Sequence, residues 1–262
     1  MEFLLLRQKE NIAYITLNNP LEYNTLTLKL LQELDGLLKK LAAERKAKVI
    51  VIEGSDKVFC AGHSLREIED KTETEVLELF QTCFNVMRTM RDIPQIVIAK
   101  VHKAAVAAGC QLVAACDMAV ASDEAKFAVP GINSGLFCST PAVFLSRNIG
   151  RKKAAELLFT GNFMSAEEAL RHGLVNKVVP ASQLDEETDK LAADVAKQSL
   201  SVIEIGKRMF YQQLNMEDFQ ALQYATHVIS LNAKHPDAKE GIRAFFEKRR
   251  PVWTDAEKFA NE

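Results

Sequence analysis

Apolar and polar residues alternate at the start of the chain and then recur at helical spacing. Residues 3–7 and 11–17 read as two short strands joined by a polar turn, which predicts a hairpin. Thr27 is a suitable N-cap for an amphipathic helix over 28–44, where leucines recur every three or four residues. Apolar runs at 48–53 and 96–101 predict buried strands, and a helix is expected between them over 74–91.

The second half of the chain has a helical pattern throughout. Short helices are predicted at 142–148, 152–159 and 166–171, each with a glycine nearby, and three or four amphipathic helices over 181–246. Neither an internal repeat nor a low-complexity linker separates the halves. Strands separated by helices indicate an α/β fold with a mixed or parallel sheet.

The segment 104–116 is the first candidate for chemistry. It opens with the small residues 104–109, directly after the apolar run 96–101, and a short buried helix is predicted over 110–116. Small side chains let a ligand approach the backbone, and the free N–H groups of a helix start attract negative charge. An enolate or a tetrahedral oxyanion is such a charge, and a tightly packed turn without a ligand is the alternative.

Composition narrows the class of protein. The chain has 262 residues, 48% of them apolar, and a formal charge of −2 without a basic block, so we expect no nucleic acid partner. No apolar run is long enough to span a membrane, and none of the cysteines has metal-ligand spacing. The odd number of cysteines favours a reducing compartment, and the first residues do not read as a targeting peptide, so the cytoplasm is expected. The cysteines are Cys60, Cys83, Cys110, Cys116 and Cys138.

Two loops, each following a strand and preceding a helix, carry a resemblance to a known family. They read FCAGHSL at 59–65 and AAGCQ at 107–111, and this pairing resembles the crotonase (enoyl-CoA hydratase/isomerase) superfamily. Further stretches agree in register along nearly the whole chain, at 24–26, 116–119, 161–169, 173–175 and 240–249. The G-H-x-L variant, AAGCQLVA, FCSTP and a terminal KR-x-PVW are most similar to the branch of enoyl-CoA hydratase domain-containing protein 3. That branch is mitochondrial in animals, so the matrix is the alternative location if a transit peptide has been removed.

The resemblance implies a fold and a ligand. The expected fold is a crotonase-like α/β spiral of β-β-α units with two roughly perpendicular sheets. Residues 1–200 would form the core with the acyl-CoA site, and the helical region 201–262 would mediate trimerisation. A homotrimer, or a hexamer formed as a dimer of trimers, is implied. Coenzyme A would enter as part of an acyl-CoA substrate, with no separate cofactor and no metal.

The resemblance also assigns roles to residues. The backbone N–H groups of His63 and Ala108 would form an oxyanion hole, and donors of this kind contribute on the order of 3 kcal/mol each. Because backbone atoms serve, a histidine at position 63 does not abolish the hole. The remaining substrate contacts would come from Glu22, Tyr23, Thr25, Ala61, Ser64, Leu65, Ala107, Pro130, Gly131, Phe245 and Lys248, the last two reaching a neighbouring subunit.

The chain departs from the family at two catalytic positions. Hydratases use two glutamates to activate water, and here Gln111 and Gly131 occupy those positions. Neither residue accepts a proton near neutral pH, and general acid–base groups typically contribute about 10²–10⁴-fold each. Nothing acidic lies between 127 and 147, where other branches place their carboxylate. Ordinary hydration is therefore not expected, and the double variant Gln111→Glu with Gly131→Glu tests whether only the acid–base pair is missing.

Three functions remain open. The first is a thioester enzyme of another kind, either a decarboxylase, hydrolase or isomerase, or a slow hydratase, with bicarbonate at Gly131 as a conceivable base. The second is an acyl-CoA binding protein without catalysis, and the third is a structural trimer. His63 could act as an acid or base or only orient its loop. Gln111 could position a water, and Cys138 could be a nucleophile or a small apolar residue of the core.

Overall fold

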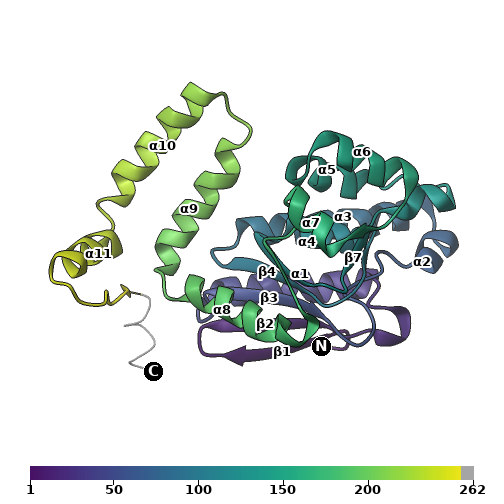
Figure 1. Ribbon diagram of the computed structural model, residues 1–262, viewed down its shortest axis with the longest axis horizontal. Coiled ribbons are helices and arrows are strands. Elements are labelled where there is room, and N and C mark those ends of the chain that lie inside the picture. The colour runs from purple at the N-terminus through teal and green to yellow at the C-terminus, as the bar shows by residue number, and fades with distance from the viewer. Residues whose placement is uncertain (255–262) are drawn as a thin grey trace.

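The computed structural model describes residues 1–254, and a six-stranded sheet forms the body of the molecule (Figure 1). Its strands lie in the order β1-β2-β3-β4-β6-β9. β1 is antiparallel to β2, and every other neighbouring pair is parallel. The strands are β1 (Leu4–Lys9), β2 (Ile12–Leu17), β3 (Val49–Gly54), β4 (Ile96–Val101), β6 (Met118–Ser122) and β9 (Lys177–Val179).

A second, smaller sheet stands beside the first. Its three strands lie in the order β5-β7-β8, with β5 parallel to β7 and β7 antiparallel to β8. They are β5 (Ala105–Val106), β7 (Lys126–Ala128) and β8 (Met164–Ser165). Two sheets were expected from the family resemblance, although no hydrophobic pattern marks strands this short.

Helices cover one face of the large sheet because its side chains alternate between two cores. Ala13, Ile15 and Leu17 point into the main core, where they meet the leucines of α1 (Leu28–Glu44). The side chain of Thr27 caps α1 by accepting a hydrogen bond from the N–H of Leu30 at 3.2 Å. The other helices on this side are α2 (Leu65–Asp70), α3 (Glu73–Asp92), α4 (Ala108–Ala115), α5 (Ser139–Asn148), α6 (Arg151–Thr160) and α7 (Ala166–His172).

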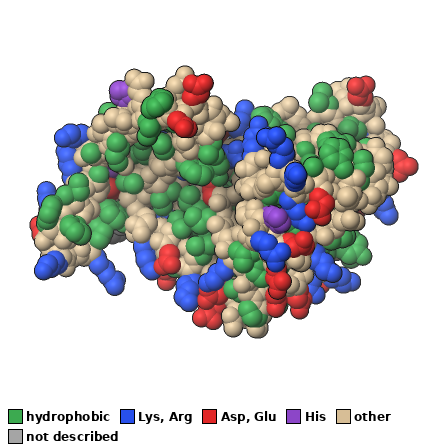
Figure 2. Space-filling view, turned by 45° about the horizontal axis from the view of Figure 1, so that its top comes forward, with side chains coloured by type: hydrophobic (Ala, Val, Ile, Leu, Met, Phe, Trp, Pro, Cys, Tyr) green, Lys and Arg blue, Asp and Glu red, His purple; other side chains and the backbone are tan. Residues whose placement is uncertain are grey.

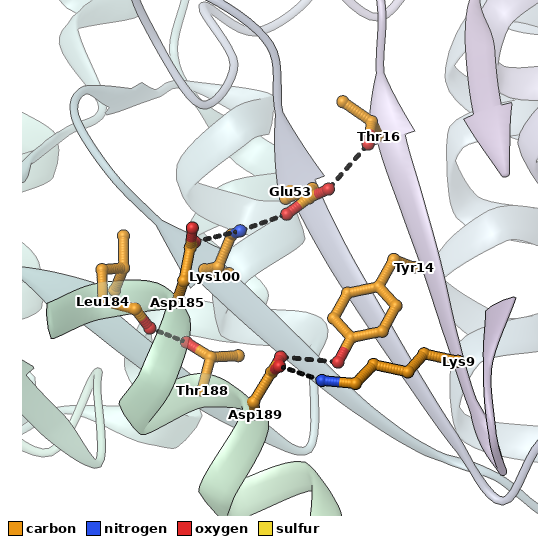
Figure 3. A network of polar contacts seen from close by, with 9 residues as sticks. All are labelled: Lys9, Tyr14, Thr16, Glu53, Lys100, Leu184, Asp185, Thr188 and Asp189. Atoms are coloured by element: carbon orange, nitrogen blue, oxygen red, sulfur yellow. Dashed lines mark hydrogen bonds and ion pairs between the residues drawn. The ribbon is translucent and has the colours of Figure 1, made fainter. Parts of the chain in front are cut away.

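The opposite face is covered by α8 (Leu184–Ala196). Tyr14 and Val51 belong to the smaller apolar cluster that packs on this helix. Polar contacts tie the helix to the strands, as Figure 3 shows: Tyr14 Oη donates to Asp189 at 2.5 Å, and Lys100 pairs with Asp185 at 2.6 Å. Burial and the neighbouring carboxylate of Asp189 raise the pKa of Tyr14.

The last helices extend away from the body as an arm (Figure 1). They are α9 (Leu200–Gln213), α10 (Asp218–Asn232) and α11 (Pro236–Phe246). Short 3₁₀ segments occur elsewhere in residues 1–254, at Pro20–Glu22, Pro130–Ser134 and Ala181–Gln183. Among the residues of α10 none is buried, and hydrophobic side chains gather over the arm in Figure 2.

A buried ion pair anchors the arm to the body. Lys207 of α9 contacts a carboxylate oxygen of Asp117 at 2.7 Å, and its ammonium also donates to the carbonyls of Met90 and Gln95. The same Asp117 oxygen accepts from the N–H of Val97, and the other oxygen accepts from Tyr211 Oη, both at 2.7 Å. These bonds fix where α9 leaves the sheet.

Most predicted elements are confirmed, with their bounds shifted by a few residues. The helix at 28–44 and the strand at 96–101 begin and end as predicted, the hairpin forms, and α8 to α11 lie within the predicted helical region after residue 181. The short buried helix was predicted to begin at 110, but α4 begins at Ala108. The loop after β3 contains a short helix, α2, that the pattern did not predict. Across residues 1–254 no helix is long and apolar enough to cross a membrane.

Candidate functional site

Two loops that follow neighbouring parallel strands meet at the candidate site. One leads from β3 to α2 and contains His63, and the other leads from β4 through β5 to α4. The loops pair through their backbones: the N–H of Val106 donates to Cys60 at 2.8 Å, and the N–H of Phe59 donates to Ala104 at 3.0 Å. The carboxyl ends of adjacent parallel strands therefore bring the two sequence motifs together.

Gly62 permits the closest approach between the loops. Its φ of 96° lies in the region that favours glycine. A β-carbon at this position would lie 2.8 Å from the Ala107 β-carbon and 3.2 Å from the backbone nitrogen of Ala108. A side chain here would push the loops apart, so this glycine is required for the two predicted oxyanion donors to stand side by side.

Ala107 adopts a strained backbone immediately before α4. Its φ is 50° and its ψ is −116°, a conformation that costs a residue with a β-carbon on the order of 1–3 kcal/mol. The surroundings hold it there, because its N–H donates to Ala128 of β7 at 2.8 Å. Strain of this kind gathers at functional sites, and here it directs the first N–H groups of α4 out of the turn.

Two backbone donors are left unpaired by this arrangement. Among residues 1–254, the N–H groups of His63 and Ala108 form no hydrogen bond within the chain. Ala108 is the first residue of α4, so its N–H has no partner inside the helix, and the positive end of the helix dipole lies at the same point. Two unpaired donors next to each other can bind an anionic oxygen.

Beside these donors lies a pocket of about 440 Å³, here called the loop pocket. Several predicted site residues line it together: Ala61, His63, Leu65, Ala107, Ala108, Pro130, Gly131 and Cys138. The rest of the wall is mostly apolar, and no aspartate or glutamate is among its described lining residues. A thioester would fit the chemistry of this lining, which offers donors for a carbonyl oxygen and no carboxylate to activate water.

The ring of His63 is held in one orientation. Its Nδ1 lies 3.1 Å from the carbonyl oxygen of Leu26, so that nitrogen carries the proton and donates. The ring meets Phe80 edge to face at 4.9 Å between centroids, and Nε2 is buried without a hydrogen-bond partner. Burial lowers the pKa of His63, which leaves Nε2 an acceptor near neutral pH. The ring therefore supports its loop and has no proton to donate from Nε2.

Cys138 and Gly131 face each other across the far wall of the loop pocket. Burial raises the pKa of the Cys138 thiol, so it is protonated near neutral pH and is a poor nucleophile. A β-carbon on Gly131 would overlap the carbonyl oxygen of Leu136 and lie 2.8 Å from the Cys138 sulfur. The structure thus argues against Gly131→Glu as a means of restoring a base, because the loop would have to move first.

Gln111 lines a different pocket from the oxyanion donors. It lies one turn after Ala108 on α4, is almost fully buried, and its side-chain oxygen has no partner. The neighbouring pocket that it lines lies between α3, α5 and α9, and Thr140 lines both pockets. The position of the first missing glutamate is therefore at the boundary between the two spaces.

The predicted coenzyme A contacts near the N-terminus lie beside the site but do not line the loop pocket. The carbonyl of Tyr23 accepts from the N–H of Ala61 at 3.1 Å, which places residues 22–25 against the first loop. Tyr23 is exposed, and the Thr25 hydroxyl is buried without a partner. The side chain of Ser64 caps α2.

Phe245 and Lys248 belong to the arm and are remote from the loop pocket within the chain (Figure 1). Phe245 is 77% exposed at the end of α11. Neither residue lines the loop pocket of its own chain, so they could contact a ligand only in the loop pocket of a neighbouring subunit.

Sequence reasoning missed several pocket residues, including Phe80, Val76, Leu136 and Phe137. Val76 and Phe80 lie one turn apart on α3, and their apolar spacing was available in the sequence. Leu136 and Phe137 lie in an irregular loop whose side chains carry no periodic signal.

Comparison with known proteins gives a consistent result. Residues 7–256 match the family model described as enoyl-CoA hydratase/isomerase. A rat relative, named enoyl-CoA hydratase domain-containing protein 3, mitochondrial, is 47% identical over 95% of this chain and 83% of its own. The human protein of that name has a crystal structure with a TM-score of 0.94 and 46% identity, covering 96% of this chain and all of the other. An enoyl-CoA hydratase from Mycobacterium smegmatis has a TM-score of 0.93 and 43% identity, covering 96% and 98%.

Proposed function

Because the chain belongs to the enoyl-CoA hydratase/isomerase family, we propose that it binds an acyl-CoA thioester in the loop pocket and stabilises an oxyanion there. The thioester oxygen would accept from the N–H groups of His63 and Ala108. The observation that carries this proposal is the pair of unpaired backbone donors beside Gly62. Each such donor is worth about 10²–10³-fold in rate when charge develops on the oxygen.

The chemistry proposed is enolate formation without a carboxylate base. In a malonyl-type thioester, the bond between the α-carbon and the carboxylate breaks and carbon dioxide leaves. The electron pair passes into the thioester carbonyl, whose oxygen is held by the two donors, and the α-carbon then takes a proton from water. An apolar pocket without aspartate or glutamate favours this reaction over hydration.

Acyl-CoA binding without catalysis is the second candidate. The lowered pKa of His63 and the raised pKa of Cys138 favour it, because the His63 ring is then not a ready acid and the Cys138 thiol is not a ready nucleophile. The two candidates share the pocket and differ only in turnover.

The first experiment combines binding and turnover. Binding of butyryl-CoA and crotonyl-CoA would be measured by calorimetry. Hydration would be measured with crotonyl-CoA as the loss of enoyl absorbance, and decarboxylation with malonyl- and methylmalonyl-CoA as the release of carbon dioxide. Binding with carbon dioxide release supports the enolate chemistry, and binding alone supports the second candidate. Hydration of crotonyl-CoA above about 1 s⁻¹ would contradict the proposed loss of the acid–base pair.

Ala108→Pro removes the donor, because proline lacks an N–H, and it also disfavours the φ and ψ of Ala107 that direct this N–H out of the turn. We expect turnover to fall about 10²-fold or more, or binding to weaken where there is no turnover. Ala166→Pro makes the same change at the first residue of α7 and should leave both unchanged. Equal effects of the two variants would contradict the role of Ala108.

We further propose that residues 201–262 form the trimerisation region and that three arms associate, with a hexamer as a dimer of trimers. The exposed apolar side chains of α9, α10 and α11 support this proposal. Phe245 and Lys248 could then approach a neighbour's nucleotide. The names of the rat and human relatives include the word mitochondrial. They therefore favour the mitochondrial matrix as the location and give no support to the cytoplasm.

A further inference from the structure

A second pocket of about 740 Å³ lies between α3, α5 and α9. We call it the arginine pocket. Arg88, Arg91 and Arg208 line it, whereas Asp92 is its one acidic lining residue among those described. Three basic groups against one acidic group leave an excess of two positive charges around the space. Arg208 is paired with Glu204 at 2.8 Å, which leaves Arg88 and Arg91 against Asp92 and reduces the excess to one positive charge.

Arg91 is the unusual member of this group. Its guanidinium carbon lies 4.8 Å from the ring centroid of Phe144 and 4.5 Å from that of Tyr211. Its Nε is buried without a hydrogen-bond partner, and within residues 1–254 Arg91 forms no ion pair. A buried N–H without a partner costs free energy, and this one belongs to a cation without a counter-charge. A ligand that brings an anion would remove that cost.

The contacts behind Arg91 hold it ready for such a ligand. The ring of Tyr211 is fixed because its hydroxyl donates to Asp117 at 2.7 Å. Asp117 is itself fixed by Lys207 and by the N–H of Val97. Arg91 therefore rests on a face that cannot rotate away, and its N–H fork stays beside the pocket.

The arginine pocket adjoins the loop pocket. Thr140 lines both, and Gln111 lies three residues after Ala108 on α4, about 4.5 Å along the helix axis. An acyl chain whose thioester lies at Ala108 would thus reach the arginine pocket by passing Thr140. Its far end would meet Arg91, which lines that pocket.

We propose that the arginine pocket binds the terminal carboxylate of a dicarboxylic acyl chain, so that the preferred ligand is a dicarboxylyl-CoA. This inference rests on the proposed acyl-CoA binding in the loop pocket and specifies its substrate class. The guanidinium of Arg91 would hold the carboxylate by two parallel N–H bonds, a geometry that arginine provides and lysine does not.

Matched pairs of thioesters test the proposal. Glutaryl-, adipoyl- and suberoyl-CoA would be compared by calorimetry with pentanoyl-, hexanoyl- and octanoyl-CoA, which differ only in the terminal carboxylate. We expect the dicarboxylyl ligand to bind about tenfold or more tightly at the chain length that reaches Arg91. Equal or weaker binding of the dicarboxylyl member at every length would overturn the inference while leaving acyl-CoA binding intact. Failure of every thioester to bind would overturn both.

Variants locate the effect. Arg91→Met keeps a long apolar side chain between the two rings and should abolish the preference while leaving affinity for the monocarboxylyl partner within about twofold. Arg91→Lys should retain only part of the preference for the dicarboxylyl ligand. Arg171→Met removes an exposed arginine of α7 and should change nothing. A preference that survives in Arg91→Met, in a variant that still binds hexanoyl-CoA, would show that Arg91 is not the anion site.

Discussion

At the residue scale, the site depends on backbone conformations that side-chain chemistry does not reveal. Gly62 and Ala107 both have positive φ, and together they place the N–H groups of His63 and Ala108 next to each other. Ala107 carries a β-carbon in a conformation that glycine would adopt more easily. The cost is met because its neighbours in β5 and β7 hold the turn.

Ala107→Gly tests whether this strain is present. We expect the free energy of unfolding in urea to stay the same or rise by up to about 1 kcal/mol, because relief of strain offsets the added freedom of the unfolded chain. The control Ala114→Gly, inside α4, should lose about 1 kcal/mol or more. A loss for Ala107→Gly as large as that of the control would mean that the turn is unstrained.

His63 makes stability depend on pH. Burial lowers its pKa in the folded chain below the ordinary value near 6.5, so the unfolded chain binds the proton more readily. Its contribution is therefore fully present above about pH 6.5 and is lost as the pH falls through the lowered pKa. His63→Gln should make the decline in unfolding free energy on acidification shallower, by at most about 1.4 kcal/mol per pH unit.

Urea denaturation between pH 7.5 and 5 measures this difference. His102, whose pKa is also lowered by burial, is present in both proteins and contributes equally. If the unfolding free energies of the variant and the original chain fall equally with pH, His63 is not buried as a neutral ring.

At the element scale, the position of α9 depends on one buried cluster. The side chains of Lys207 and Asp117 are only 2% and 8% exposed, and Asp117 also receives bonds from β4 and from Tyr211. Through its contact with Lys207, Asp117 links segments 90 residues apart in the chain. The same cluster orients Tyr211 and hence the wall of the arginine pocket.

Asp117→Asn should destabilise the chain by about 3–5 kcal/mol, because it leaves the Lys207 ammonium buried without its counter-charge. Asp185→Asn makes the same substitution in the ion pair with Lys100, where the Asp185 side chain is 85% exposed, and should cost less than about 1 kcal/mol. Urea denaturation compares them. Similar small losses for both would mean that α9 does not depend on the buried pair.

At the scale of the whole molecule, the arm exposes more apolar surface than is usual for helices that remain in contact with water. Phe219, Leu222, Ile229 and Leu231 are all exposed on α10. Contiguous apolar surface of this kind marks an interface between proteins, and the proposed trimer would cover it.

Sedimentation velocity tests the assembly. The chain should sediment at three times its mass of 29.2 kDa, or six times for a hexamer, and Leu222→Glu with Ile229→Glu should shift it to the mass of one chain. Gln220→Glu adds a charge to the same helix and should leave the assembly intact. A single-chain mass for the unaltered protein would refute the trimer.

The sequence by itself determined those helices and strands that are long enough to show a pattern of apolar and polar residues. The leucines of α1 and the hairpin were predictable because burial on one face imposes a period of 3.6 or 2. The strand at 96–101 was predictable from its apolar run, because both of its faces are buried. The two small-residue loops, and Gln and Gly at positions 111 and 131, were equally visible, since both are statements about residue identity.

Only the tertiary structure decided how those residues meet. Strands of two or three residues, such as β5 and β8, form because a partner strand lies beside them and carry no pattern of their own. The strained turn at Ala107, the burial of Gln111 on the wall of another pocket, and Arg91 between two rings all depend on distant segments. A local pattern records which face of an element is buried, whereas a binding site depends on which other element covers that face.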